Sequence, residues 1–204
     1  VINLLRRPDR KNNVIQNFKN ANITNYEFIE AVDGNALIPT SEIITLFKGN
    51  DFGNRRGVVG CALTHYNLWK NLLESDFDYF LIMEDDFKIV ETFKAEIEKI
   101  NFEKYDILLM GYHMFSDTLE KVKSIYHRNY NQKCKNEDMN IIIDKLQMDY
   151  FIGGTHCYSI NKSGAKKLID YIDKNGIKHG IDYLFKIVPE LECFETRPHI
   201  SFAE

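Results

Sequence analysis

The sequence has few cysteines, and they stand far apart. The four are Cys61, Cys134, Cys157 and Cys193, with no CxxC pair and no closely spaced histidines. This spacing favours neither a zinc site nor a disulfide framework. We therefore expect reduced thiols in small, buried positions.

Long apolar runs and an excess of positive charge are also absent. The longest apolar runs, Tyr79–Met83 and Ile141–Ile143, are far shorter than the roughly 20 residues of a membrane span. With 26 Lys and Arg against 30 Asp and Glu, the net charge of −4 gives no support for a nucleic-acid partner. The chain begins at Val1 inside a strand-like run, so we interpret residues 1–204 as an excerpt of a longer chain and assign no localisation.

The sequence does contain a strand–helix–strand pattern at its start. Val1–Leu5 and Tyr26–Val32 have the composition of strands, and Pro8–Ala21 has a helical apolar spacing with proline in its first turn. Such a unit is typically parallel with a right-handed crossover. Strands and helices alternate further along the 204 residues. We predict one α/β domain with a mixed, mainly parallel sheet and helices on both faces.

Later segments fit this pattern. Helices are predicted at Ser41–Phe47, Gly60–Ser75 and Thr92–Ile100, from a cap at Asn161 or Ser163 to Lys174, and from Gly180. Strands are predicted at Tyr79–Met83 and Asp106–Met110. Residues Phe115 to Asp144 are polar and irregular, and we interpret them as a surface excursion that serves as a lid. Gly153 and Gly154 lie in a predicted loop, where paired glycines let a ligand approach the backbone.

Three carboxylates, Glu84-Asp85-Asp86, follow the apolar strand Tyr79–Met83 directly. In an open α/β sheet, ligands bind beyond the carboxyl ends of the strands. Side chains alternate along a strand, so Glu84 and Asp86 are expected on one side and Asp85 on the other. Oxygen ligands of this kind suit Mg²⁺ or Mn²⁺. The alternative is a solvated acidic turn.

Basic residues follow the first strand. The tips of two parallel strands meet at one edge, so Arg6, Arg7 and Asp33 are expected to lie together near a bound nucleotide. The alternative for the arginines is a solvated helix start, although cations there oppose the helix dipole. His65 lies in the first turn of a predicted helix, either as a core histidine or as a functional one.

Six short motifs occur together in the order and spacing of one known family. They are Ile2-Asn3-Leu4 with Arg7 and Asp9-Arg10, Ala31-Val32-Asp33-Gly34, Gly60-Cys61-Ala62 with His65-Tyr66 and Trp69, Glu84-Asp85-Asp86, Gly164-Ala165 with Leu168, and Ile181-Asp182 with Leu184-Phe185. Over essentially its whole length the chain resembles glycosyltransferase family 25, which holds bacterial lipooligosaccharide galactosyltransferases and the procollagen galactosyltransferase domain.

This resemblance implies a GT-A-like (Rossmann-like) fold, a UDP-sugar donor, usually UDP-galactose, a divalent metal, usually Mn²⁺, and inversion at the anomeric carbon. Glu84-Asp85-Asp86 would be the DxD-like metal motif, and Asp182 the carboxylate on the acceptor side. The residues assigned to the nucleotide sugar are Asn3, Leu4, Arg7, Asp33, Gly60, His65, Gly153 and Gly154.

The metal and the general base are assigned to particular side chains. Glu84 and Asp86 are the predicted ligand pair for Mn²⁺ or Mg²⁺, with His199 as a third ligand folding back over the crevice. The alternative for His199 is an ordinary surface histidine. Asp182 is the predicted base, with Asp149 as the runner-up, and its alternative is a helix-start carboxylate favoured by the dipole.

The sequence thus predicts a metal-dependent inverting glycosyltransferase. It would move a hexose, galactose in the first instance, from a UDP-sugar to a hydroxyl of a collagen-like hydroxylysine or of a glycan. A catalytically silent relative that binds a sugar nucleotide, a glycan or a partner protein is the alternative. Loss of the acidic triplet or of Asp182 would mark that silent form, and both are present. An unrelated nucleotide-binding regulator is a third possibility.

Overall fold

The computed structural model describes residues 1–115, 141–146 and 151–203. Most of the predicted lid therefore lies outside the described residues, as does Asp149. Within them, no helix has both the length and the apolar character that a membrane span requires.

Nine strands are described: β1 (Ile2–Asn3), β2 (Ile29–Glu30), β3 (Tyr79–Met83), β4 (Phe87–Ile89), β5 (Ile107–Phe115), β6 (Ile142–Lys145), β7 (Phe151–Asn161), β8 (Cys193–Arg197) and β9 (Ser201–Ala203). The α-helices are α1 (Pro8–Asn20), α2 (Ser41–Leu46), α3 (Arg56–Glu74), α4 (Phe93–Ile97), α6 (Lys162–Asn175) and α7 (Ile181–Ile187). A 3₁₀ turn covers Phe102–Lys104.

The central sheet has the strand order β3-β7-β5-β8-β6. A parallel bridge between Ile2 and Glu84 joins the parallel pair β1–β2 to the end of β3. Strands β1, β2, β3, β5 and β8 run in one direction, whereas β7 and β6 run against their neighbours. The predicted α/β class with a mixed sheet is therefore confirmed. The arrangement is that of a Rossmann-like GT-A fold.

Both faces of the sheet are buried, as the alternation along β5 shows. Ile107 and Leu109 belong to one hydrophobic cluster and Leu108 and Met110 to the other, and all four have 0% of their surface exposed. Successive side chains of a strand point to opposite faces, so β5 contributes to both clusters. A strand buried on both faces has a continuous apolar sequence, and β5 begins with one.

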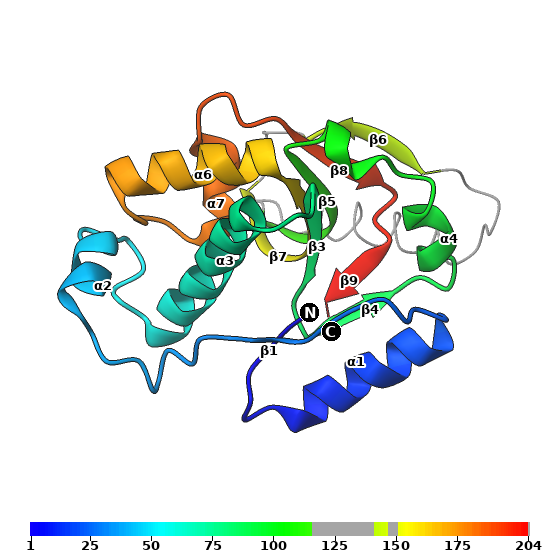
Figure 1. Cartoon of the computed structure of the whole chain (residues 1–204), viewed down its shortest axis with the longest axis horizontal. Helices are drawn as coiled ribbons and strands as arrows, with labels where there is room; N and C mark the ends of the chain where they lie inside the picture. Colours follow the sequence, from blue (N-terminus) through cyan, green and yellow to red (C-terminus); the bar gives the residue numbers. More distant parts are fainter. Residues whose placement is uncertain (116–140, 147–150, 204) are drawn as a thin grey trace.

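Helices cover the two faces (Figure 1). The cluster on one face takes its helical residues from α3, α6 and α7, including Trp69 and Phe185. The other cluster takes them from α1 and α4, including Phe18 and Phe93, and adds residues of β4 and β9. The predicted placement of helices on both faces is confirmed, and it leaves the strand tips open between α1 and α3.

Local signals set several element ends. Pro8 is the first residue of α1, where its missing N–H costs nothing, and the helix ends within a residue of the prediction. Asn161 caps α6 by accepting a hydrogen bond from the Gly164 N–H at 2.8 Å. Helix α3, however, begins at Arg56, four residues before the predicted start at Gly60.

The predicted loop at Gly153 and Gly154 is wrong, because both residues lie within β7. The register of β5 against β7 shifts on both sides of Gly111. Gly154 has a φ of +58°, and a Cβ there would contact the His113 ring. Gly154 therefore serves an irregular strand in which the His113 ring crowds the backbone.

The first turns of α3 pack directly against the segment after β2. A Cβ at Gly60 would collide with the Val32 carbonyl, and one at Gly34 with the Arg56 carbonyl. The Val32 N–H also donates a hydrogen bond to Thr64 Oγ1 at 2.9 Å. Gly60 thus has a packing role that holds α3 close to Asp33.

We expect Gly60→Ala to lower the free energy of unfolding by about 1–3 kcal/mol, the usual cost of overpacking. Gly57→Ala is the matched control, since nothing lies within 4 Å of a Cβ at Gly57 in the same helix. That substitution should be neutral or stabilise by up to about 1 kcal/mol, because alanine is the better helix former. Urea unfolding measures both variants. Equal effects would show that the close approach of α3 does not limit stability.

Candidate functional site at the end of strand β3

A cavity lies where the tips of β1, β2 and β3 meet the first turns of α3. Its walls include Leu4, Arg10, Asp33, Cys61, His65 and Glu84. Four of these, Leu4, Asp33, His65 and Glu84, were predicted site residues. The carboxyl ends of neighbouring strands are where open α/β sheets bind ligands. The cavity is therefore the candidate site.

Asp85 is held by two residues from the start of the chain. Asn3, which is 6% exposed, donates its side-chain N–H to Asp85 Oδ2 at 2.6 Å and to the Arg7 carbonyl at 3.1 Å. Arg10 Nη1 donates to Asp85 Oδ1 at 2.8 Å. Asn3 thereby ties β1 and the start of α1 to the end of β3.

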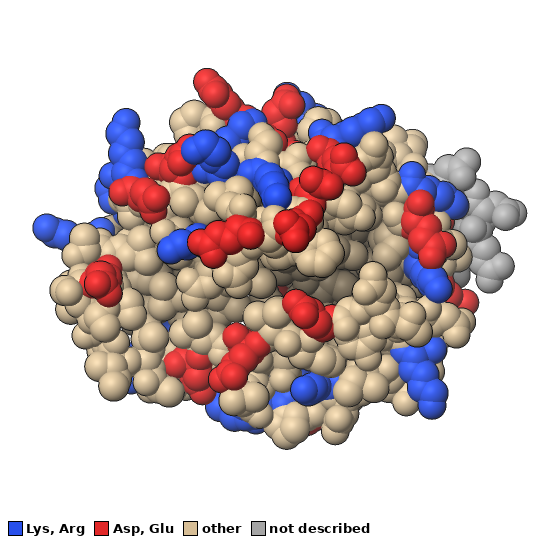
Figure 2. Space-filling view, in the orientation of Figure 1, with Lys and Arg blue, Asp and Glu red and all other residues tan. Residues whose placement is uncertain are grey.

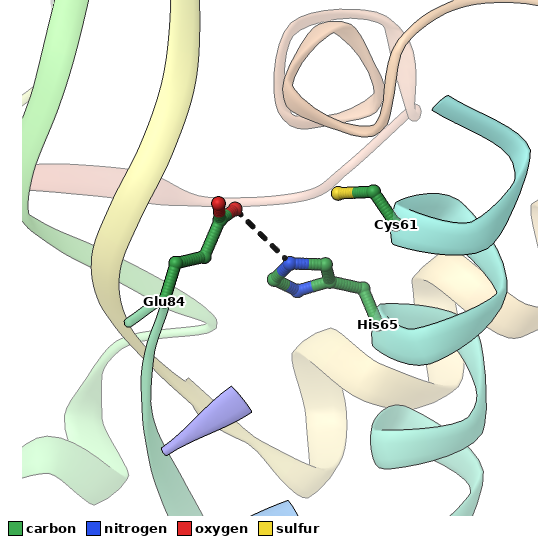
Figure 3. Close-up of side chains that lie close together, drawn as sticks. All are labelled: Cys61, His65 and Glu84. Atoms are coloured by element: carbon green, nitrogen blue, oxygen red, sulfur yellow. Dashed lines mark ion pairs between the residues drawn. The ribbon is translucent and has the colours of Figure 1, made fainter. Parts of the chain in front are cut away.

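The predicted alternation of the three carboxylates is wrong, because the chain turns at Asp85 and Asp86. Arg10 Nη1 also donates to Asp86 Oδ2, at 3.1 Å, so Asp85 and Asp86 share one guanidinium. Glu84 is the last paired residue before this turn, and its side chain points toward α3 (Figure 3).

Glu84 faces His65 across the cavity. His65 Nε2 lies 3.4 Å from Glu84 Oε1, and the His65 side chain is 1% exposed. Burial alone would raise the pKa of Glu84, but the contact with His65, together with His156 and Arg10, outweighs it and lowers that pKa. Glu84, whose side chain is 29% exposed, is therefore a carboxylate at neutral pH.

The pKa of Asp86 is shifted in the opposite direction from that of Glu84. Burial raises its pKa, and the nearby charge of Glu84 raises it further, while Arg10 opposes both effects. The repulsion between Glu84 and Asp86 is thus only partly offset by Arg10. A divalent cation between the two carboxylates would remove it.

The predicted cluster of Arg6, Arg7 and Asp33 is formed in part. Arg6 Nε donates to Asp33 Oδ2 at 2.7 Å, so the tips of β1 and β2 meet as expected. Arg7 pairs instead with Asp9, at 2.7 Å, and does not line the cavity. Arg6 was expected near the nucleotide, and it lines the cavity, whereas Arg10, which also lines the cavity, was not selected from the sequence.

Asp182 comes to the same region from the other end of the chain. It stands in the first turn of α7, and its Oδ2 accepts a hydrogen bond from the Gly154 N–H at 3.1 Å. Burial raises the pKa of the Cys61 thiol well above its usual range, and the carboxylates of Glu84, Asp182 and Asp86 raise it further. Asp182 and the acidic end of β3 therefore act on the same thiol.

His199 lies elsewhere. It is 2% exposed, and its ring contacts the Tyr112 ring at 4.5 Å between centroids. Its Nε2 lies 3.9 Å from Glu195 Oε2. Burial alone would raise the pKa of Glu195, but the nearby His199 ring and the hydrogen bonds from Tyr112 and Arg197 outweigh it and lower that pKa to about 2. The interpretation of His199 as an exposed surface histidine is wrong, and the residue is absent from the cavity lining.

The charged side chains on the face shown in Figure 2 are of both signs. Figure 2 shows acidic and basic side chains interspersed over one face of the molecule. The net charge of the whole chain is −4. An extended basic surface would be expected for nucleic-acid binding. The face in Figure 2 gives no indication of that function.

The mixed sheet has the expected GT-A-like arrangement, and the acidic turn lies at the tip of β3. A family model described as glycosyltransferase family 25 (LPS biosynthesis protein) matches residues 1–185. The chain belongs to this family, and the resemblance inferred from its motifs is confirmed.

Curated relatives carry related names. The chain is 34% identical over 175 residues to the putative glycosyltransferase R655 of Acanthamoeba polyphaga mimivirus, covering 83% of this chain and 51% of that protein. It is 27% identical over 180 residues to mouse procollagen galactosyltransferase 2, covering 83% and 27%. It is 29% identical over 109 residues to the human inactive glycosyltransferase 25 family member 3, covering 49% and 18%. The chain thus spans about half or less of these three proteins.

Proposed function

We propose that this chain is a metal-dependent inverting glycosyltransferase. It transfers a hexose, galactose in the first instance, from a UDP-sugar to a hydroxyl group of its acceptor. The observation that carries the proposal is the acidic turn at the end of β3, which adjoins a cavity between the tips of β1 and β2 and the start of α3. Family membership supports glycosyl transfer as the reaction.

Glu84 and Asp86 are the proposed ligands of Mn²⁺ or Mg²⁺. Both are oxygen donors, and their mutual repulsion raises the pKa of Asp86 after the effect of burial. Asp85 is already engaged by Asn3 and Arg10, which suits a residue that fixes the turn. When bound, the metal would neutralise charge that develops on the leaving diphosphate. His199 is left out, because its described contacts are with Glu195, Tyr112 and Phe202.

The donor nucleotide is proposed to lie along β1 and the segment after β2. Leu4 and Asp33 line the cavity and suit the uridine, and Arg6 already holds Asp33. Arg10 lines the cavity beside the acidic turn, so it replaces Arg7 as the proposed diphosphate contact. A planar guanidinium with several donors fits phosphate oxygens. Asn3 acts indirectly, by fixing Asp85.

Asp182 is the proposed general base. Inversion requires the acceptor hydroxyl to attack from the face opposite the diphosphate and to lose its proton as the bond forms. A carboxylate within hydrogen-bond reach is the simplest acceptor of that proton. The hydrogen bond from the Gly154 N–H orients the Asp182 carboxylate, and Asp182, Glu84 and Asp86 all raise the pKa of the Cys61 thiol. Asp170, in contrast, pairs with Lys166 and has a side chain that is 61% exposed.

The acceptor is proposed to be a hydroxyl of a collagen-like hydroxylysine or of a glycan. Procollagen galactosyltransferase 2 is among the curated relatives, as is a putative glycosyltransferase of Haemophilus influenzae. A silent relative that binds without transfer is the second candidate, because a related human protein is named inactive. The acidic triplet and Asp182 are both present, which favours the active form.

The metal assignment predicts a Mn²⁺-dependent release of UDP. We expect the chain to release UDP from at least one of UDP-galactose, UDP-glucose and UDP-N-acetylglucosamine, and only with Mn²⁺ or Mg²⁺ present. Asp86→Ala should lower this release at least about 100-fold, since charge stabilisation at a leaving group commonly contributes that much. A luminescent UDP assay measures it.

The control for Asp86→Ala is Asp170→Ala, which removes an exposed carboxylate on α6 and should leave UDP release unchanged. Donor binding without release would identify the silent relative. Release that does not depend on a metal, or that survives Asp86→Ala, would remove the acidic turn from the reaction.

The base assignment predicts a separation of chemistry from binding. Asp182→Asn keeps the shape of the side chain but removes its basicity. We expect transfer to the acceptor to fall by about 10²–10⁴-fold, the contribution typical of a general base. The affinity for UDP and Mn²⁺, measured by calorimetry, should stay within a factor of about two. Transfer at the wild-type rate would make Asp182 a structural residue and return the search to Asp149.

A further inference from the structure

Cys61, His65 and Glu84 form a compact group of potential metal ligands. The Cys61 sulfur, a His65 ring nitrogen and a Glu84 carboxylate oxygen all lie within 4.8 Å of one another. Cys61 and His65 lie one turn apart on α3 and point toward Glu84 at the end of β3 (Figure 3). A spacing of i and i+4 puts two ligands on one helix face, as in known zinc-binding helices.

The distance from His65 to Glu84 is that of two ligands of one ion. The 3.4 Å between Nε2 and Oε1 is long for a hydrogen bond. Nε2 is fully buried and makes no hydrogen bond with any described residue. Nitrogen and oxygen ligands at about 2.0–2.2 Å from a tetrahedral zinc ion lie roughly 3.4 Å apart. The side chains of Glu84 and His65 therefore already stand at a coordinating separation.

The far side of the His65 ring is fixed by buried aromatic residues. His65 Nδ1 lies 2.7 Å from the Tyr158 hydroxyl, which also accepts a hydrogen bond from Trp69 Nε1 at 3.0 Å. The side chains of Trp69 and Tyr158 are wholly buried, with 0% exposure each. Such a partner on the second nitrogen orients a metal-binding histidine. It keeps Nε2 directed at Glu84.

We propose that Cys61, His65 and Glu84 bind Zn²⁺, with a fourth position open to the cavity that all three residues line. A sulfur, an imidazole and a carboxylate together suit zinc, whereas Mn²⁺ and Mg²⁺ prefer oxygen ligands. On binding, the Cys61 thiol gives its proton to solvent, and the resulting thiolate coordinates the ion. Residue spacing alone did not indicate this site, because its third ligand comes from another element.

The zinc site has a consequence that rests on the proposed function. Glu84 would be a ligand in both the Zn²⁺ group and the Mn²⁺ group, so the two ions cannot both have it. Zn²⁺ is therefore expected to inhibit sugar transfer, and added Mn²⁺ should relieve the inhibition. Zinc would thus compete with manganese for Glu84, and it would not replace manganese in sugar transfer.

Cobalt absorption tests the site without relying on activity. Co²⁺ added to the reduced chain should give a near-ultraviolet band from thiolate-to-cobalt charge transfer, and Zn²⁺ should abolish the band. Cys61→Ser should remove the band and His65→Gln should weaken Co²⁺ binding at least tenfold. Cys193→Ala is the control, since Cys193 is buried with its thiol on the Phe185 carbonyl, and it should keep the band.

Circular dichroism verifies that each variant is folded. The absence of a thiolate band in the wild-type chain, or an equal band in Cys61→Ser, would overturn the proposal. In the transfer assay, the Zn²⁺ concentration for half-inhibition should rise at least tenfold in Cys61→Ser, and equal inhibition would overturn the competition for Glu84. A chain without transfer activity would contradict the proposed function alone, because the cobalt spectrum reports the zinc site independently.

Discussion

Three consecutive carboxylates at the end of β3 are the constraint on which this structure depends. Adjacent negative charges in a partly buried turn repel one another unless donors or cations reach them. Here the donors come from separate elements: Asn3 and Arg10 reach Asp85, and His65 approaches Glu84. Meeting this electrostatic requirement brings β1, α1 and α3 together around one strand end. The cavity forms between them.

The three carboxylates differ in their partners. Asp85 has two donors and fixes the turn, whereas Asp86 shares Arg10 and keeps a raised pKa from burial and from Glu84. Glu84 belongs to two environments, because it adjoins Asp86 on one side and the buried pair of His65 and Tyr158 on the other. The chemistry of the site therefore depends on which cation or hydrogen-bond donor offsets the negative charges of Glu84 and Asp86.

Local signals along the chain predicted the fold and part of the site. The proline at the start of α1, the Asn161 cap of α6 and the apolar run of β3 each act within a few residues, so their elements were predictable. The meeting of Arg6 with Asp33 followed from the parallel β1–α1–β2 unit. The acidic turn was selected because three carboxylates directly follow a buried strand, and the motifs around it resemble those of one family, although a solvated turn was the alternative.

The remaining features depend on contacts between distant parts of the chain. Arg10 and Asp85 are 75 residues apart, and no local pattern pairs them. His199 was expected over the crevice, but Tyr112 and Glu195 from two other strands bury it. Gly153 and Gly154 were predicted to form a loop, but both lie inside β7. At Gly154 the His113 ring leaves no room for a Cβ, so glycine is required there.

The central claim is that the acidic turn holds a divalent ion together with a nucleotide diphosphate. Calorimetric titration of the wild-type chain with UDP, in the presence and absence of Mn²⁺, tests it most directly. The account predicts saturable binding of one UDP per chain with Mn²⁺, and an affinity at least about tenfold lower without it, a difference of roughly 1.4 kcal/mol. An affinity for UDP that is the same with and without Mn²⁺ would contradict the account.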